Sequence, residues 1–464
     1  MNDVPASSGD NTRLARERQR PWKLAVLWLA ALVVLFHLSY GFAGWLAEQR
    51  SELDAVVFRW EHYVPFVAWT VVPYLSIIAF YGVSTLICST QAELTAHGRR
   101  LLTAQLIAVA VFTIRPLPFT FEQPEIAGLL GAILALPASI GTQFNQATSL
   151  HTALLMILCV LYARHVPRRV RPALAVWFAL AGAAAMTAYQ HHFLGIPTGA
   201  LLGWFCVWLW PEAAPSPLSG LSCSQDRRRW QVAVYYGVGA AVVASLALWI
   251  GDAGLWLLWP ASSLLMVAAF YAGIGERGFQ KRTDGRMNPA AQWLLAPYLL
   301  GAWINSRLWT RHNPAPANVM DQVWLGRFPS REDLRSTDAR CVIDLTAELP
   351  ARGPSCAWHC VPMLDLVTPS ARALREAAEQ IQRCRESGPV LVCCALGYGR
   401  SAAALTTWLV RSRRVVSIEA AVALLRHARP QLVLHAADLD EIALAADDGQ
   451  ASADALSTQR EPAA

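Results

Sequence analysis

The stretch Cys394-Ala-Leu-Gly-Tyr-Gly-Arg400-Ser401 decides the fold of the C-terminal part of the chain. Five residues separate the thiol from the arginine, so the backbone between them can curl into a ring whose N–H groups point inward and bind an anion. The apolar run Pro389–Val392 predicts a short buried strand before the ring, and Ser401–Val410 predicts a helix after it. We therefore expect a strand, an anion-binding loop and a helix whose N-terminal dipole faces the loop.

The side chains of this stretch indicate how the anion is held. Arg400 can grip two phosphate oxygens with its planar guanidinium, and the positive surroundings favour the thiolate form of Cys394. Two glycines, Gly397 and Gly399, are expected to supply the backbone angles that a tight ring needs. The residues inside the ring carry no charge, which favours a ligand with a single phosphate. The predicted phosphate-binding loop is Ala395, Leu396, Gly397, Tyr398 and Gly399.

Residues from about 316 to 440 resemble a dual-specificity protein-tyrosine phosphatase domain. The ring matches the C-x5-R-[ST] signature of the cysteine-dependent phosphatases, Asn318–Arg327 resembles the family's first strands, and Cys341–Leu345 resembles a central strand. A closing Arg429-Pro430, after a helix opened by Ser417, also fits the family. The resemblance implies an α/β domain with a central sheet flanked by helices.

The resemblance also implies a two-step reaction. Cys394 would attack phosphorus, a phosphocysteine would form and be hydrolysed, and Ser401 would assist release of the thiolate. The leaving oxygen needs a proton, and the family's acid lies on a loop about thirty residues before the cysteine. Asp365 occupies that place, although it could instead serve as a turn or helix-capping residue before Pro369. Asp344 is the second candidate, but its position in a strand-like run favours a structural role.

One residue departs from the family pattern. Cys393 stands immediately before the nucleophile, where the family usually has a histidine that helps to orient the loop and ionise the thiol. The vicinal pair Cys393–Cys394 could be redox-sensitive, or Cys393 could simply be a small buried residue at the end of the strand.

The remainder of the chain has the composition of a membrane protein. Of its 464 residues, 55% are hydrophobic and only 16% charged, with 19 Trp and a mean hydropathy of +0.32. Long apolar segments predict a multi-span helical membrane domain of about eight helices over residues 23–275. The predicted spans lie near 24–46, 65–88, 100–115, 149–165, 172–190, 195–211, 230–250 and 254–274.

Loop charges predict the orientation of these spans. Basic residues cluster in alternate loops, whereas the opposite loops carry only Arg50, Arg59 and Arg115. The positive-inside rule then places both termini in the cytoplasm of a bacterial-type inner membrane. A reducing cytoplasm also suits a catalytic thiolate, and the ten cysteines show no disulfide or zinc spacing. We expect no metal or other cofactor and no nucleic-acid partner, but attraction to anionic membrane lipids.

This orientation divides the chain into five predicted segments. The apolar stretch Pro289–Trp309 holds Pro297 and is interpreted as an amphipathic or re-entrant linker on the inner face. The segments are a basic cytoplasmic N-terminus (1–22), the membrane domain (23–275), a cytoplasmic linker (276–315), the phosphatase domain (316–445) and a disordered tail (446–464).

The membrane half carries histidines at predicted span ends. Residues 60–211 resemble the type-2 phosphatidic acid phosphatase superfamily, which implies His191 as a nucleophile and His151 as an acid. The orienting Asp of that family is replaced by Gly195, and its Ser-Arg pair by Ala184–Ala185. These departures leave two possibilities open, a weakened half that anchors the protein or binds lipid, and a half with its own phosphatase or transferase activity.

Three functions follow from these observations. The first is a membrane-anchored cysteine-dependent phosphatase whose substrate is a phosphorylated membrane protein or a lipid phosphate. The second is a lipid phosphatase or headgroup transferase that uses His151 and His191, with a regulatory cytoplasmic domain. The third is a non-catalytic receptor for phospholipid or phosphoprotein, disabled by Cys393.

Overall fold

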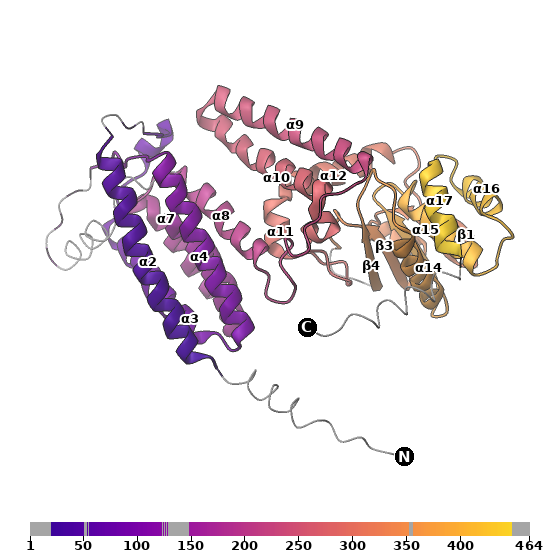
Figure 1. Ribbon diagram of the computed structural model, residues 1–464, viewed down its shortest axis with the longest axis horizontal. Coiled ribbons are helices and arrows are strands. Elements are labelled where there is room, and N and C mark those ends of the chain that lie inside the picture. The colour runs from indigo at the N-terminus through magenta and orange to yellow at the C-terminus, as the bar shows by residue number, and fades with distance from the viewer. Residues whose placement is uncertain are drawn as a thin grey trace, which may run out of the picture. The chain divides into compact units, whose positions relative to one another are not determined.

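The computed structural model describes residues 20–50, 53, 55–122, 124, 126, 128, 148–351 and 356–447. These residues form two compact units, the first over residues 1–219 and 250–253, the second over 220–249 and 254–464 (Figure 1). The predicted domain boundary at residue 275 lies inside the second unit. Most of the predicted tail and N-terminus lies outside the described residues.

The first unit is a bundle of apolar helices. Helices α6 and α8 pack closely because Gly199 and Gly203 leave room for the backbone of α6, where a Cβ at Gly203 would lie 2.6 Å from the Ala153 oxygen. Leu155 and Leu158 of α6 are buried in a core cluster with Ile77, Phe178 and Ala181. The helices are α2 (Trp22–Glu48), α3 (Val71–Ile87), α4 (Gln91–Ile114), α6 (Leu150–His165), α7 (Arg171–Thr187) and α8 (Gly195–Leu209), with short 3-10 turns η1 (Arg59–Tyr63) and η2 (Ala68–Thr70).

The prediction of about eight spans is supported only in part. Each predicted span coincides with helical structure, but among the described residues four segments are long and apolar enough to cross a membrane. The segments Leu150–His165, Arg171–Thr187 and Gly195–Leu209 are apolar but shorter, and the segment predicted at 100–115 is part of the more polar α4. The four candidate spans are Trp22–Glu48, Ala68–Ile87, Arg227–Ile250 and Asp252–Phe279.

The second unit begins with helices that lead into a β-sheet. Three aromatic rings tie them together, since Tyr271 lies 5.6 Å from Tyr236 and Tyr298 lies 5.7 Å from Tyr236. The elements are α9 (Arg227–Ile250), η3 (Asp252–Leu257), α10 (Leu258–Ala269), the π-turn η4 (Phe270–Ile274), η5 (Gly275–Phe279), α11 (Pro289–Leu294) and α12 (Ala296–Trp309). The predicted linker stretch Pro289–Trp309 is thus helical, and Leu300, Trp303 and Trp309 on α12 are exposed.

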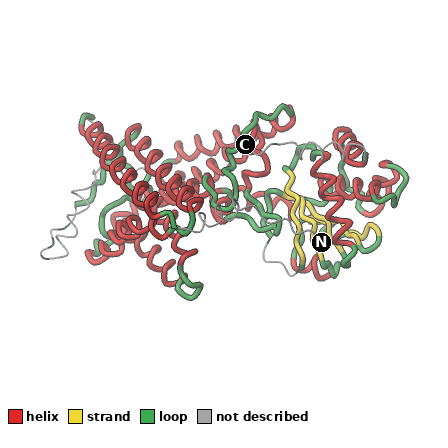
Figure 2. The backbone as a smooth tube through the Cα atoms, turned by 60° about the horizontal axis from the view of Figure 1, so that its bottom comes forward, coloured by secondary structure: helices red, strands yellow, loops and turns green. Residues whose placement is uncertain are grey.

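A five-stranded mixed sheet forms the centre of the second unit (Figure 2). The strand order is β1-β2-β5-β3-β4, in which β1 and β2 are antiparallel and the other neighbours are parallel. The α/β architecture and the predicted strands are therefore confirmed, while β4 (Ala357–Met363) and two helices, Arg331–Ser336 and Ala436–Ala446, were not predicted. The strands are β1 (Ala317–Met320), β2 (Val323–Arg327), β3 (Cys341–Thr346), β4 (Ala357–Met363) and β5 (Val390–Cys394).

Both faces of this sheet are covered. On one face, Ile343 and Val392 belong to a core with helices α14 to α17. On the other face, Val342 and Leu391 pack with residues from α13 and with Ala302 of α12. Parallel strands require cover on both faces, and α12 of the linker provides part of it here. The helices are α13 (Arg331–Ser336), α14 (Ala371–Arg385), α15 (Arg400–Arg411), α16 (Ile418–Ala428, capped by Ser417) and α17 (Ala436–Ala446).

Candidate active site

The predicted strand, loop and helix meet at the carboxyl edge of the sheet. Cys394 is the last residue of β5, and α15 begins at Arg400 after the loop. Cys394 lies beside Arg327 of the parallel neighbour β2, and its side chain is 3% exposed. The N-terminus of α15 has no side-chain cap, so its free backbone donors are available to an anion in the loop.

Two groups lie within hydrogen-bond distance of the Cys394 sulfur. The Gly397 backbone N–H donates to Sγ at 3.2 Å, and the buried Ser401 Oγ lies 3.3 Å from the same sulfur. Donors that point at a thiolate stabilise its negative charge. The structure therefore brings together Cys394 and Ser401 as the sequence predicted.

The two loop glycines do different things. Gly397 has φ +76°, and a Cβ there would lie 2.5 Å from the Gly326 carbonyl carbon, so both the angle and the space require glycine. Gly399 has φ −110°, which other residues adopt readily, and its Cβ would meet nothing closer than the Val433 oxygen at 3.7 Å. The ψ of Gly399 is −83°, outside the ordinary helical and extended regions, so the expectation for Gly399 stays a prediction, whereas φ and space both require glycine at Gly397.

Arg400 is buried and held by a carboxylate that the sequence analysis missed. Its Nη1 and Nη2 donate to the two oxygens of Glu348 at 3.0 and 2.7 Å, and Nη1 also donates to the Met363 carbonyl at 2.8 Å. Its Nε is buried and has no partner among the described residues, which leaves a donor for a phosphate oxygen. Glu348 follows the carboxyl end of β3, which adjoins β5, and this adjacency is the signal that could have identified it.

Asp365 also contacts Arg400, from the loop that follows β4. Its Oδ1 is 3.1 Å from Arg400 Nη2, and 36% of its side chain is exposed. Loss of water around the carboxyl raises the pKa of Asp365, and the Glu348 charge adds to this, against the opposing attraction of Arg400. For Glu348 burial also favours a raised pKa, but Arg400 outweighs it and the pKa is lowered. The two carboxyl groups therefore have pKa values shifted in opposite directions, which favours Glu348 as the fixed charge and Asp365 as the group that exchanges a proton.

Residues 323–443 match the family model of the dual specificity phosphatase catalytic domain. This part of the chain is a dual specificity phosphatase domain. The chain is accordingly a phosphoric monoester hydrolase of that type.

The phosphatase domain is also similar to solved structures. Tk-PTP in its active form is 25% identical, with a TM-score of 0.27, and the match covers 29% of this chain and 99% of that one. Human DUSP28 is 22% identical, with a TM-score of 0.27 and coverage of 29% and 99%. PTPMT1 in complex with PI(5)P is 15% identical, with a TM-score of 0.27 and coverage of 30% and 98%. Comparison with curated proteins gives no match.

Two residues outside the phosphatase loop support its backbone. The fully buried Arg429 donates to the Leu396 carbonyl at 3.5 Å, and its guanidinium lies 5.1 Å from the centre of the Tyr398 ring. On the opposite side, the Ser306 hydroxyl of α12 donates to the Ala395 carbonyl. The predicted closing arginine thus acts on the phosphate loop, and Ser306 is a second support that the sequence analysis missed.

Cys393 is separated from the phosphatase chemistry. Adjacent strand residues point to opposite faces, so Cys393 packs with Val342 and Leu391 while Cys394 belongs to the other core. Burial, followed by the nearby Asp344 charge, raises the pKa of the Cys393 thiol well above its ordinary value. The structure favours the interpretation of Cys393 as a buried strand residue. Asp344 accepts from Lys281 Nζ at 2.6 Å inside the protein, which fits its structural role.

The two histidines of the membrane half lie around one tyrosine. His151 stacks on Tyr74 with ring centres 4.0 Å apart, and His191 lies 6.4 Å from the same ring. His151 Nε2 and His191 Nδ1 are buried and lack hydrogen-bond partners among the described residues. The buried Glu61 carboxylate pairs with the neighbouring His192 at Nδ1, at 2.9 Å. A carboxylate therefore orients His192, and not the predicted nucleophile His191.

One group of side chains could hold a metal, although none was predicted. The ligand atoms of Cys341, His359 and Cys384 all lie within 4.8 Å of one another. They come from β3, β4 and α14, and none of them is a residue of the phosphate loop.

Proposed function

We propose that the chain is a membrane-anchored, cysteine-dependent phosphatase that hydrolyses a phosphate monoester carried at the membrane surface. Cys394 is the nucleophile, Arg400 binds the phosphoryl group, Asp365 is the acid and then the base, and Ser401 assists turnover. Glu348 positions Arg400 through its paired hydrogen bonds.

The geometry supports a reaction in two balanced steps. In the first, the Cys394 thiolate attacks phosphorus, the ester P–O bond breaks, and the protonated Asp365 gives its proton to the leaving alcohol or phenol oxygen. In the second, the Asp365 carboxylate takes a proton from water as the water oxygen attacks the phosphocysteine. The P–S bond breaks, inorganic phosphate forms, and the Ser401 hydroxyl stabilises the departing thiolate.

Contacts of the acid loop support a substrate at the membrane surface. The Tyr271 hydroxyl of η4 donates to the Asp365 carbonyl at 2.9 Å, and Arg228 Nε of α9 donates to the Leu366 carbonyl at 3.2 Å. Both donors lie within candidate spans near their phosphatase-side ends. An active site attached so closely to these ends meets membrane-bound substrates at high effective concentration. This single observation carries the membrane part of the proposal.

The test is phosphate release by the purified full-length protein in mixed micelles with reductant and without added metal. A lipid phosphomonoester is compared with a phosphotyrosine peptide. We expect release from the lipid, loss of it in Cys394→Ser, and unchanged release in Cys223→Ser, which alters an exposed cysteine away from the site. Equal rates on a soluble peptide would contradict the membrane-surface substrate, and activity in Cys394→Ser would contradict the mechanism.

We also propose that the phosphatase domain faces the cytoplasm of a bacterial-type inner membrane. The support is the low number of basic residues in the predicted outer loops, Arg50, Arg59 and Arg115. A C-terminal green fluorescent protein fusion should fluoresce and a C-terminal alkaline phosphatase fusion should be inactive. The reverse pair of results would show the opposite orientation.

A second candidate activity rests on the membrane half. His151 and His191 each carry a buried ring nitrogen that has no hydrogen-bond partner within the described ranges, which is the state expected of groups that await a ligand. A lipid phosphatase or transferase at this site would retain activity in Cys394→Ser and lose it when His191→Ala is added. The absence of any residual activity in Cys394→Ser would remove this candidate.

A further inference from the structure

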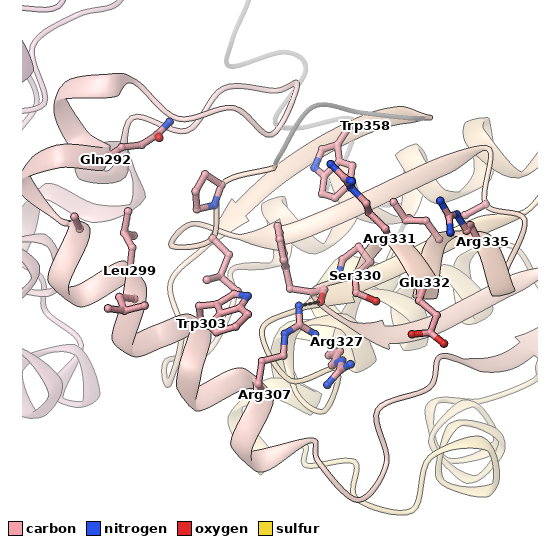
Figure 3. A pocket seen from close by; sticks show the side chains of 18 of the residues that line it. Gln292, Leu299, Trp303, Arg307, Arg327, Ser330, Arg331, Glu332, Arg335 and Trp358 are labelled. Carbon is pink, nitrogen blue, oxygen red and sulfur yellow. Dashed lines mark hydrogen bonds between the residues drawn. The ribbon is translucent and has the colours of Figure 1, made fainter.

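A large groove lies between α12 and the segment from Arg327 to Ala339 (Figure 3). Its volume is about 1370 Å³, which is larger than the roughly 300–1,000 Å³ of most small-molecule pockets. Cys394, Arg400 and the residues between them are not among its lining residues. The groove adjoins the phosphate loop through Arg327, which lies beside Cys394 in the sheet, but the proposed reaction uses none of its lining residues.

The two walls of the groove differ in chemistry. One wall is apolar and comes from α12, with Leu299, Leu300 and Trp303. The other wall carries Arg327, Arg331 and Arg335, and Arg307 of α12 lies near Arg327 (Figure 3). The lining contains four arginines, Arg307, Arg327, Arg331 and Arg335, against two acidic residues, Glu332 and Asp338.

Two of these arginines have a buried nitrogen that makes no hydrogen bond within the described part of the chain, although the Asp333 carboxylate lies 3.7 Å from Arg327 Nε. Arg307 Nη1 and Arg327 Nε have no hydrogen-bond partner among the residues that the structure describes. Their other nitrogens are engaged, Arg307 Nη2 with the Phe328 carbonyl at 3.0 Å and Arg327 Nη1 with Thr310 Oγ1 at 2.9 Å. Buried donors without acceptors are costly, and a phosphate oxygen is an acceptor that guanidinium groups bind well.

The apolar wall identifies the rest of the occupant. Helix α12 also exposes large apolar side chains outside the groove, including Leu308 at 58% and Trp309 at 70%. Exposed tryptophan and leucine side chains of this kind are typical of helices at a membrane interface. A soluble phosphate would use the arginines and leave the apolar wall in water, whereas a lipid covers both walls.

We propose that this groove binds one anionic phospholipid, with its headgroup phosphate on the arginines and an acyl chain along α12. The site is independent of the hydrolysis at Cys394, because a phosphodiester lipid such as phosphatidylglycerol offers no monoester to that loop. It has a route to the phosphatase, since Ser306 of α12 donates to the Ala395 carbonyl of the loop.

The test is native mass spectrometry of the delipidated full-length protein in a neutral detergent. Phosphatidylglycerol, phosphatidylcholine and soluble glycerol 3-phosphate are titrated separately. We expect one molecule of phosphatidylglycerol to bind tightly and phosphatidylcholine to bind more weakly. Glycerol 3-phosphate should not bind at the same concentrations. Removing two positive charges with Arg331→Gln/Arg335→Gln should weaken phosphatidylglycerol binding at least tenfold.

Matched variants separate the groove from general charge effects. Arg372→Gln/Arg383→Gln removes two exposed charges from α14 outside the groove and should leave binding unchanged. Cys394→Ser should also leave it unchanged, and Trp303→Ala should weaken it. Equal binding by the Arg331/Arg335 variant and wild type would overturn the site. Glycerol 3-phosphate binding as tight as that of the lipid, with no effect of Trp303→Ala, would overturn the lipid as its occupant.

Discussion

At the scale of single residues, one guanidinium separates two carboxyl groups into different roles. Arg400 pairs with both oxygens of Glu348 and is also within 3.1 Å of Asp365. The pKa of Glu348 is lowered and that of Asp365 is raised. When the pKa values of two carboxyl groups diverge in this way, one group serves as a fixed negative charge and the other as a proton donor.

The role of Asp365 predicts the pH dependence of the reaction. The acid must carry its proton, so activity should fall as pH rises through the pKa of Asp365, which lies above the ordinary 3.8. Asp365→Asn should lose this falling limb and lower kcat by about 10²–10⁴-fold. The check is a set of pH–rate profiles for the full-length protein on an alkyl phosphate. Asp440→Asn, exposed on α17, is the control, and a wild-type rate in Asp365→Asn would exclude the role.

The phosphate loop gives a second prediction at this scale. In Gly397→Ala the new Cβ meets the Gly326 carbonyl, and the φ of +76° adds about 1–2 kcal/mol of strain. We expect a lower melting temperature and at least a hundredfold loss of phosphate release. Gly399→Ala has both space and an ordinary φ and should lose less stability. Equal effects of the two changes would show that the loop does not depend on the Gly397 geometry.

Sequence spacing identified most of this site because its central parts are consecutive. Cys394, Arg400 and Ser401 are fixed relative to one another by a single loop. Glu348 could not be identified this way, since it reaches Arg400 only after β3 is placed beside β5. The same limit applies to Glu61, which lies far in sequence from its partner His192.

At the scale of elements, the hydrophobic pattern predicted the positions of helices better than it predicted which elements they pack against. Each predicted span became helical, but the pattern did not show that α9 and α10 belong to the same compact unit as the sheet. It also missed β4, whose sequence Ala357–Met363 includes Pro362 and His359 and lacks a clean alternation. These relations depend on contacts between distant segments, which periodicity does not encode.

The contact between η4 and the acid loop gives the prediction for this scale. Tyr271→Phe removes the hydroxyl that donates to the Asp365 carbonyl, a hydrogen bond worth about 0.5–1.5 kcal/mol. We expect kcat to fall roughly two- to tenfold with KM nearly unchanged, because the change misplaces the acid and not the phosphate loop. Tyr235→Phe on α9, with an exposed side chain, is the matched control. A change in KM alone would show that Tyr271 acts on substrate binding.

At the scale of the whole molecule, the linker is part of the folded phosphatase unit. Lys281 Nζ donates to Asp344 Oδ2 and to the Thr346 carbonyl, and both side chains of this ion pair are buried. The same segment pairs by backbone hydrogen bonds, since the Cys360 N–H donates to the Thr283 carbonyl at 2.8 Å. A buried ion pair that loses one partner leaves an uncompensated charge. The phosphatase sheet therefore depends on residues before the start of the matched family segment.

This dependence predicts how fragments of the chain behave. A fragment of residues 316–464 keeps the phosphate loop but lacks Lys281, so Asp344 is left buried without its cation. We expect it to be less stable than a fragment of residues 276–464 by about 3–5 kcal/mol in urea unfolding, with both kept in the same mild detergent. Asp344→Asn supplies the control because it removes the orphaned charge. It should stabilise the short fragment and destabilise the long one, and a change of the same sign in both would show that Lys281 does not support the sheet.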